Sequence, residues 1–292
     1  EEPFHVKYWG LGNELYGDWQ FGAMNASDYA KKALDSAKAM KWMDPEIELV
    51  ACGYDLGSDW NYEVARVLKP LIGHLAIHHY SIGYGIFTDE DYRQCMYIPD
   101  YITKLTNAAR ASVVAGTNDA LSEIKIAWDE WNTHAWDLEK KDDDRNYTLR
   151  NAVLTAGILH SFIRSSDIVE IAGYSPFVNV CGAISVKKDR VLKRPQYYVF
   201  ELLSKVFGEC TEYVETRLEC DTCSMPEVID YSNRPAEAKF ALNAKTTVRY
   251  VETGYLDCAA SMNRERSRLA LSLINKSEDR DCTVDVSVFG SS

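Results

Sequence analysis

The sequence lacks the dense, regularly spaced cysteines of a disulfide scaffold. Eight are spread over 292 residues at irregular spacing, which is too sparse for a disulfide scaffold, so we expect reduced thiols. Cys220 and Cys223 form one CxxC pair, but neither a second pair nor a downstream histidine follows at the spacing of a zinc site. The cysteines therefore predict no disulfide framework, and they make a structural metal a weak hypothesis.

Long apolar runs and a surplus of basic residues are also lacking. No run is long enough to span a bilayer, and no signal segment opens the chain. The 44 acidic residues outnumber the 32 basic ones and leave a net charge of -12, which disfavours binding of nucleic acid or of an anionic membrane surface. We therefore expect a neutral substrate, with no nucleic-acid partner and no membrane partner.

The chain also lacks an ordinary beginning. Glu1-Glu2-Pro3 leads within a few residues into a strand that looks buried, and no initiator methionine precedes it, so we expect further elements ahead of residue 1. The 292 residues are nevertheless enough for one large domain or one and a half.

Strands and helices alternate five times in the residues before Gly208. Alternation of this kind predicts an α/β fold, with a parallel sheet and crossover helices. Ser27 is expected to cap a helix that ends at Asp44-Pro45, and a long loop is expected over 84–100. The apolar runs predict strands that lead to Asn13 and that cover 47–52, 75–77, 124–128 and 168–174, and helical spacing predicts helices up to Lys69 and over 102–115, 147–164 and 195–206.

The character changes after Gly208, where no helical period continues. Short apolar runs between turn residues predict strands and a β-sandwich portion. We therefore divide the chain into domains at 1–207 and 208–292, and we expect both to be incomplete. The predicted strands are 217–219, 227–231, 246–252, 269–274 and the alternating residues Val284, Val286 and Val288.

Two strand ends carry candidate catalytic carboxylates. Glu14 follows the first strand, and Glu130 follows the fourth. Carboxylates at strand ends of one barrel can face each other, and a retaining glycosidase needs them about 5 to 5.5 Å apart, one ionised as nucleophile and one protonated as acid. The residues alone do not say which glutamate has which role, and a capping role for Glu14 in a polar turn is the alternative.

His78-His79-Tyr80 closes the third predicted strand, and Asp129 precedes Glu130. The two histidines could be a metal pair, but adjacent strand side chains point to opposite faces and no carboxylate is spaced to join them. Asp129 should face away from Glu130 and support it indirectly. The tryptophans expected to have packing or loop roles are Trp42, Trp60 and Trp136.

Several motifs carry a resemblance to a known family. In order and spacing, the chain resembles glycoside hydrolase family 51, chiefly α-L-arabinofuranosidases, over most of residues 5–207. The resemblance implies a partial TIM (β/α)8 barrel, about its last five β/α units, followed by part of a jelly-roll-like C-terminal β-sandwich. The motifs are KYWGLGNELYGDWQFG, DPEIELVACG, AIHHYS, AWDEWN and RPQYYVFELLSK.

The resemblance also assigns site residues. It implies that Glu14 is the acid/base and Glu130 the nucleophile. Asn13 would hydrogen-bond the sugar 2-hydroxyl, and Tyr80 would touch the nucleophile. The remaining substrate-binding residues that it implies are His78, as a pocket histidine, and Trp19, as an aromatic wall of the sugar site.

The chain departs from the family at a few positions. The family's arginine, asparagine and glutamate that bind arabinose from the early strands have no counterpart in this chain. His134 stands where many members have a tryptophan, and Arg194 stands where some have a glutamine. Specificity is therefore expected to differ within the family.

The function that follows is a retaining exo-glycosidase that removes terminal α-L-arabinofuranosyl groups by double displacement. The expected partner is an arabinose-containing oligo- or polysaccharide, with no cofactor and no metal. Family habit suggests a homo-oligomer and a cytoplasmic location. The alternatives are an endoglucanase or β-xylosidase on the same scaffold, or a non-catalytic carbohydrate-binding or structural fragment.

Overall fold

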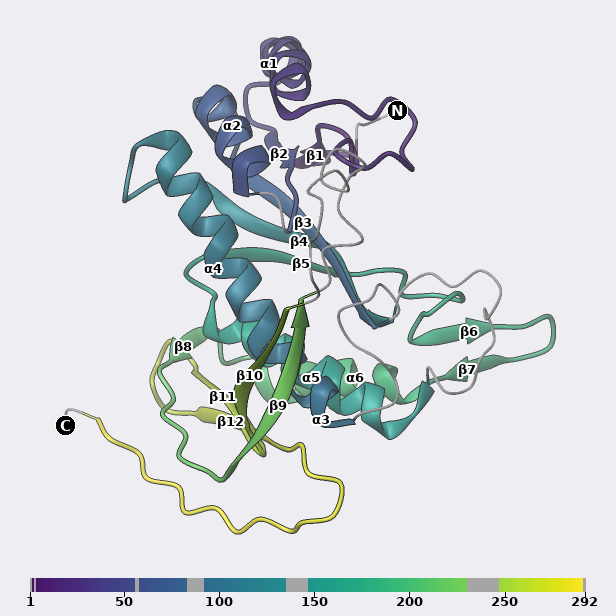
Figure 1. Ribbon diagram of the computed structural model, residues 1–292, viewed down its shortest axis with the longest axis vertical. Coiled ribbons are helices and arrows are strands. Elements are labelled where there is room, and N and C mark those ends of the chain that lie inside the picture. The colour runs from purple at the N-terminus through teal and green to yellow at the C-terminus, as the bar shows by residue number, and fades with distance from the viewer. Residues whose placement is uncertain are drawn as a thin grey trace.

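The computed structural model describes residues 2, 4–55, 58–82, 92–134, 147–229 and 247–290. Its main feature is a five-stranded parallel sheet in the order β1-β2-β3-β4-β5 (Figure 1). Strands that neighbour one another in chain order form the wall of a (β/α) barrel, whereas doubly wound sheets reverse their order. This confirms the predicted α/β class and partial barrel. The strands are β1 (Tyr8–Gly10), β2 (Glu48–Cys52), β3 (His74–Ile82), β4 (Lys125–His134) and β5 (Val169–Tyr174).

Helices connect the strands, and Figure 1 shows α1, α2 and α4 lying along one side of the sheet. In α1 the apolar side chains at helical spacing, Tyr29, Ala33 and Ala37, are buried, as an amphipathic helix on a sheet requires. None of the described helices combines the length and apolar character needed to cross a membrane. The helices are α1 (Ala26–Met43), α2 (Ser58–Leu68), α3 (Tyr92–Met96), α4 (Ile98–Thr117), α5 (Leu149–Arg164) and α6 (Pro195–Phe207).

Two local predictions about helices were wrong. Asn25, rather than Ser27, caps α1, because its Oδ1 accepts a hydrogen bond from the Asp28 backbone N–H at 2.9 Å. Part of the segment expected as a loop, 92–100, is helical, and Pro99 lies in the first turn of α4, where its missing N–H costs nothing. Residues 84–91 and Trp136 lie outside the described residues.

Strands β3 and β4 continue past their apolar runs. His78 pairs with Glu130, His79 with Trp131 and Tyr80 with Asn132 in a parallel ladder. The ladder uses backbone groups, so polar side chains do not end it. His78, Tyr80 and Glu130 therefore lie within strands rather than in the loops after them, whereas Glu14 lies in the turn after β1.

The residues after Gly208 form two small antiparallel sheets, in the orders β12-β11-β8 and β10-β9. No strand is found at 217–219 or at 284–288, where alternation alone has no pairing partner. Four strands were not predicted: β8, the two strands of the β6–β7 hairpin before α6, and β11, whose alanines are poor strand formers. The strands are β6 (Ile184–Val186), β7 (Val191–Lys193), β8 (Glu212–Val214), β9 (Thr222–Ile229), β10 (Thr247–Gly254), β11 (Leu256–Met262) and β12 (Leu269–Asn275).

A buried polar cluster joins helix α5 to strand β11. His160 Nδ1 lies 2.8 Å from Asp257 Oδ1, and Arg164 Nη1 donates to the same oxygen at 2.7 Å. Burial alone would raise the pKa of Asp257, but His160 and Arg164 hold it below its ordinary value. Contacts therefore cross the domain boundary predicted at 207, and that boundary stays a prediction.

Candidate active site

Glutamates from two strand ends converge with a histidine between them. Glu14 follows β1, His78 lies on β3 and Glu130 lies on β4. One ligand atom from each of the three lies within 4.8 Å of the other two. The structure therefore brings the two predicted catalytic carboxylates together at the carboxyl ends of the strands, where barrel enzymes carry their sites.

Glu14 sits in a tight turn with a left-handed backbone, φ 49°. Its Oε2 accepts hydrogen bonds from Trp19 Nε1 at 2.7 Å and from Gln20 Nε2 at 3.3 Å. Gly17 allows this arrangement, since a Cβ there would lie 2.4 Å from the Trp19 ring. The hydrogen bonds to the Glu14 carboxylate come from side chains rather than helix N–H groups, which argues against the capping alternative.

His78 is buried and contacts three carboxylates. Its Nδ1 lies 2.9 Å from Glu14 Oε1 and 3.7 Å from Glu130 Oε2, and its Nε2 lies 3.0 Å from Asp129 Oδ1. Burial alone would lower the pKa of His78, but the carboxylates, Asp129 first, raise it to about 10. His78 is therefore a cation at neutral pH.

The electrostatics of Glu14 differ from those expected of a resting general acid. Burial would raise its pKa, but the hydrogen bonds and charge of His78, with the Trp19 and Gln20 hydrogen bonds, hold it below the ordinary value. The expectation that one of the two carboxyl groups is protonated as the acid took no account of the histidine between the two glutamates. The titratable group in contact with Glu14 is the His78 imidazole, whose Nδ1 lies 2.9 Å from Glu14 Oε1.

Glu130 is held by Tyr80, whose hydroxyl donates to Glu130 Oε2 at 2.8 Å and lies 3.0 Å from Ser175 Oγ. Asn132 donates from Nδ2 to the Ser175 carbonyl at 3.0 Å. The contact of Tyr80 with Glu130 is the one that the resemblance implied. Ser175, just after β5, and Asn132 were missed, because a lone serine and an amide in a strand carry no distinctive signal.

His79 and Asp129, the sequence neighbours of His78 and Glu130, make different contacts. His79 lies on the opposite face of β3, with Nδ1 2.8 Å from Asp55 Oδ2, so the two histidines do not form a metal pair. The expectation that no carboxylate joins His78 was wrong, because Glu14 and Glu130 reach it from other strands. Asp129 contacts His78 and so acts on the glutamates through the imidazole.

Two predicted sugar-binding residues are open to solvent. Asn13 is exposed, and Trp19 is 63% exposed while its indole N–H holds Glu14. Arg194 instead is buried and donates to the carbonyls of Asn179 and Gly182. Trp19 is thus placed to contact a ligand beside Glu14, whereas Arg194 orders the chain before α6.

The other tryptophans differ in burial. Trp60 is buried, and its indole N–H donates to the Cys52 carbonyl, which is the expected packing role. Trp42 is 82% exposed on α1, so packing does not explain it. The side chain of His134 lies outside the described residues.

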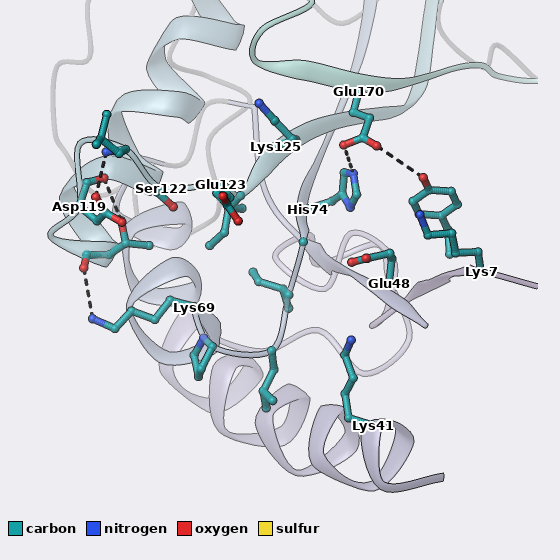
Figure 2. A pocket seen from close by; sticks show the side chains of 18 residues that line it. Lys7, Lys41, Glu48, Lys69, His74, Asp119, Ser122, Glu123, Lys125 and Glu170 are labelled. Atoms are coloured by element: carbon teal, nitrogen blue, oxygen red, sulfur yellow. Dashed lines mark hydrogen bonds and ion pairs between the residues drawn. The ribbon is translucent and has the colours of Figure 1, made fainter. Parts of the chain in front are cut away.

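A cavity of about 970 Å³ lies at the opposite, amino end of the strands (Figure 2). Figure 2 shows His74 and Glu170 pointing toward each other there, with His74 Nε2 3.1 Å from Glu170 Oε2. Three of the lysines that line it donate to backbone carbonyls, Lys41 to Ile47, Lys69 to Thr117 and Lys125 to Asp167. This cavity is therefore not the site that contains the two glutamates.

Comparisons with known proteins agree with this arrangement. A family profile described as α-L-arabinofuranosidase C-terminal domain matches residues 129–288. A probable α-L-arabinofuranosidase C of Aspergillus clavatus is 29% identical over 96% of this chain and 55% of its own length. An intracellular exo-α-(1→5)-L-arabinofuranosidase of Bacillus subtilis is 27% identical over 96% of this chain and 54% of its own. The chain thus spans about half the length of the curated relatives it matches.

Solved structures give the same result. The α-L-arabinofuranosidase of Thermotoga maritima, in a complex with arabinose, has a TM-score of 0.74 and 28% identity, over 94% of this chain and 52% of its own. The GH51 enzyme of Thermotoga petrophila has a TM-score of 0.74 and 29% identity over the same shares. Together with the profile match over more than half of the chain, these comparisons show that the chain belongs to the α-L-arabinofuranosidases of glycoside hydrolase family 51.

Proposed function

We propose that this protein is a retaining exo-acting α-L-arabinofuranosidase, with Glu130 as nucleophile and Glu14 as acid/base. The observation that carries the proposal is the convergence of the two carboxylates, which lie within 4.8 Å of each other through their nearest ligand atoms. Retaining glycosidases use carboxyl groups about 5 to 5.5 Å apart, whereas inverting ones need room for a water between them. The substrate proposed is a neutral arabinose-containing glycan, in keeping with the relatives' names.

In the first step, Glu130 attacks the anomeric carbon and the bond from that carbon to the leaving oxygen breaks, while Glu14 gives that oxygen a proton. In the second step, Glu14 takes a proton from water, and the resulting hydroxide displaces Glu130 from the anomeric carbon. Sugar and water enter, and free arabinose and the shortened glycan leave. No redox partner or cofactor is needed.

The contacts of each carboxylate support these two roles. Tyr80 donates to Glu130 and orients it as the nucleophile. Glu14 is hydrogen-bonded to His78 Nδ1 at 2.9 Å, so a proton can move from the imidazolium to Glu14 when a sugar replaces water. His78 thus supplies the proton that Glu14 lacks at rest.

The face beside Glu14 has the groups needed to hold a sugar. Trp19 offers an exposed indole for stacking, and Asn13 offers an amide for the 2-hydroxyl. These contacts, and the cytoplasmic location and homo-oligomer suggested by family habit, stay predictions.

A panel of aryl glycosides tests the activity. We expect the purified protein to hydrolyse an aryl α-L-arabinofuranoside at least about 100-fold faster, in kcat/KM, than the matching β-D-xyloside and β-D-glucoside. Preference for either of the latter would favour the alternative activities. Binding of arabino-oligosaccharide without turnover would favour a non-catalytic carbohydrate-binding protein.

A further inference from the structure

The two predicted catalytic carboxylates and His78 together also resemble a metal site with three protein ligands. Within the described residues, Glu14, His78 and Glu130 form a group whose ligand atoms lie within 4.8 Å of one another. Three protein ligands with one open position is the usual arrangement of a zinc site that exchanges its fourth ligand. The question is whether spacing, orientation and charge fit a cation.

The spacing is close to that of a tetrahedral cation. Zinc bonds to nitrogen and oxygen of about 2.0 to 2.2 Å put neighbouring ligand atoms about 3.3 to 3.6 Å apart. His78 Nδ1 lies 2.9 Å from Glu14 Oε1 and 3.7 Å from Glu130 Oε2. Shifts of a few tenths of an ångström would bring His78 Nδ1 and each of these two oxygens to the spacing of ligands on one cation, and the two oxygens already lie within 4.8 Å of each other.

A neighbouring side chain already orients each of the three ligands. Asp129 lies 3.0 Å from His78 Nε2, on the side of the ring away from Nδ1, which is the carboxylate–histidine arrangement that orients metal-binding imidazoles. Trp19 donates to Oε2 of Glu14, the oxygen away from His78, and Tyr80 donates to Glu130 Oε2, the oxygen that also faces His78. The ligand atoms would thus lose little freedom on binding a cation.

The charge of the group favours a divalent ion. Glu14, Asp129 and Glu130 bring three carboxylates around one imidazole, which leaves negative charge even when His78 is protonated. A mixed set of imidazole and carboxylate ligands suits a transition cation such as Zn²⁺ better than Mg²⁺, which prefers oxygen ligands and keeps its waters.

We propose that Glu14, His78 and Glu130 form a binding site for a divalent transition cation of the Zn²⁺ class, which reversibly blocks the site. The cation would bind Glu14 Oε1, His78 Nδ1 and Glu130 Oε2, and the Nδ1 proton would be released to solvent. Binding of the cation does not depend on any catalytic step. Only the inhibition of turnover by the cation rests on the proposed function.

Isothermal titration calorimetry with ZnCl2 tests the site, in a background of Cys220→Ser and Cys223→Ser so that the CxxC thiols contribute nothing. We expect one high-affinity Zn²⁺ per chain and no comparable binding of Mg²⁺. His78→Gln should weaken Zn²⁺ binding at least about 100-fold, and Asp129→Asn, which keeps all three ligands, by about 10- to 100-fold. His74→Gln is the matched control, since it removes another histidine of β3 with a glutamate partner, and it should change affinity less than about twofold.

Circular dichroism establishes that each variant is folded, and the Asp129→Asn result stands even if His78→Gln is not. Absence of Zn²⁺ binding at about 100 μM, or equal affinity in the His74→Gln, His78→Gln and Asp129→Asn variants, would overturn the site. Turnover of an aryl arabinofuranoside, measured with Zn²⁺ and again with excess EDTA, separates the two proposals. Zn²⁺ binding with no turnover in EDTA would refute the proposed function and leave the metal site standing, whereas turnover that Zn²⁺ does not inhibit would contradict the proposed blockade.

Discussion

Strand β3 carries a histidine at each end of the sheet, and each histidine meets a glutamate, yet the two surroundings differ. At the amino end, His74 contacts Glu170 at 3.1 Å beside a cavity of about 970 Å³. At the carboxyl end, His78 contacts Glu14, Asp129 and Glu130. The cavity therefore lies at the end where the histidine contacts one carboxylate, and the two predicted catalytic glutamates lie at the end where the histidine contacts three.

The difference shows what makes a site in this fold. The His74–Glu170 contact at the amino end joins only two strands, β3 and β5, across β4. Glu14 and Glu130 can both contact His78 only because the carboxyl ends of β1, β3 and β4 lie at the same edge of the sheet. Substitutions at the two ends should therefore have effects of different size and kind.

The largest effect is expected from Glu130→Gln, which keeps the shape and removes the nucleophile. Turnover of an aryl α-L-arabinofuranoside should fall at least about 1,000-fold, since no covalent intermediate can form. The measurement is kcat at saturating substrate, with a thermal melt to establish that the variant is folded. A loss below about tenfold would remove Glu130 from the role of nucleophile.

Glu14→Ala should have an effect that depends on the leaving group. A sugar leaves as a poor alkoxide leaving group unless an acid protonates it, whereas an activated phenolate leaves with little help. General acids contribute about 100- to 10,000-fold to the reaction rate. We expect hydrolysis of an arabino-oligosaccharide to fall by that range and cleavage of an activated aryl glycoside far less. Equal losses on both substrates would contradict the acid role.

His78→Gln should change the pH dependence of stability. The folded pKa of about 10 exceeds the ordinary 6.5, so protonated His78 stabilises the fold fully below pH 6.5, and this contribution is lost as the pH rises through about 10. The difference in unfolding free energy between wild type and variant, from urea titrations at pH 6, 8 and 10, should therefore shrink as the pH rises. A difference that stays constant or grows would mean that His78 is neutral.

The smallest effect is expected at the amino end. His74→Gln removes a contact with a half-exposed glutamate, so it should cost about 1 kcal/mol or less of stability and leave turnover within about twofold. Urea unfolding and kcat/KM measure the two quantities. A large loss of turnover would show that the two ends are coupled and that the comparison between them fails.

Much of the barrel portion could be predicted from the sequence, because its strands are apolar runs and its helices have clear apolar faces. Glu14, Glu130 and Tyr80 were placed correctly at one end of the sheet, since parallel strands put their carboxyl ends together. The lowered pKa of Glu14 could not be predicted, because it depends first on the hydrogen bond with His78, which lies on β3, and then on the Trp19 hydrogen bond and the charge of His78.

The β-rich portion was less predictable for related reasons. The alanines of β11 carry little strand signal, and alternation at 284–288 has no partner strand in the described part of the chain. Ser175 and Asn132 reach Tyr80 and its surroundings only through the fold. Contacts between residues far apart in the sequence decide which segments form strands and which side chains reach the site. A local sequence pattern does not reveal those contacts.

The most direct test of the account is azide rescue of two alanine variants, followed by the configuration of the arabinosyl azide formed. If Glu130 is the nucleophile, azide should replace it in Glu130→Ala and give an arabinosyl azide of inverted configuration. If Glu14 is the acid/base, azide should attack the covalent intermediate in Glu14→Ala and give the retained configuration. The reverse assignment of products, or no azide product from either variant of an otherwise active protein, would contradict the central claim.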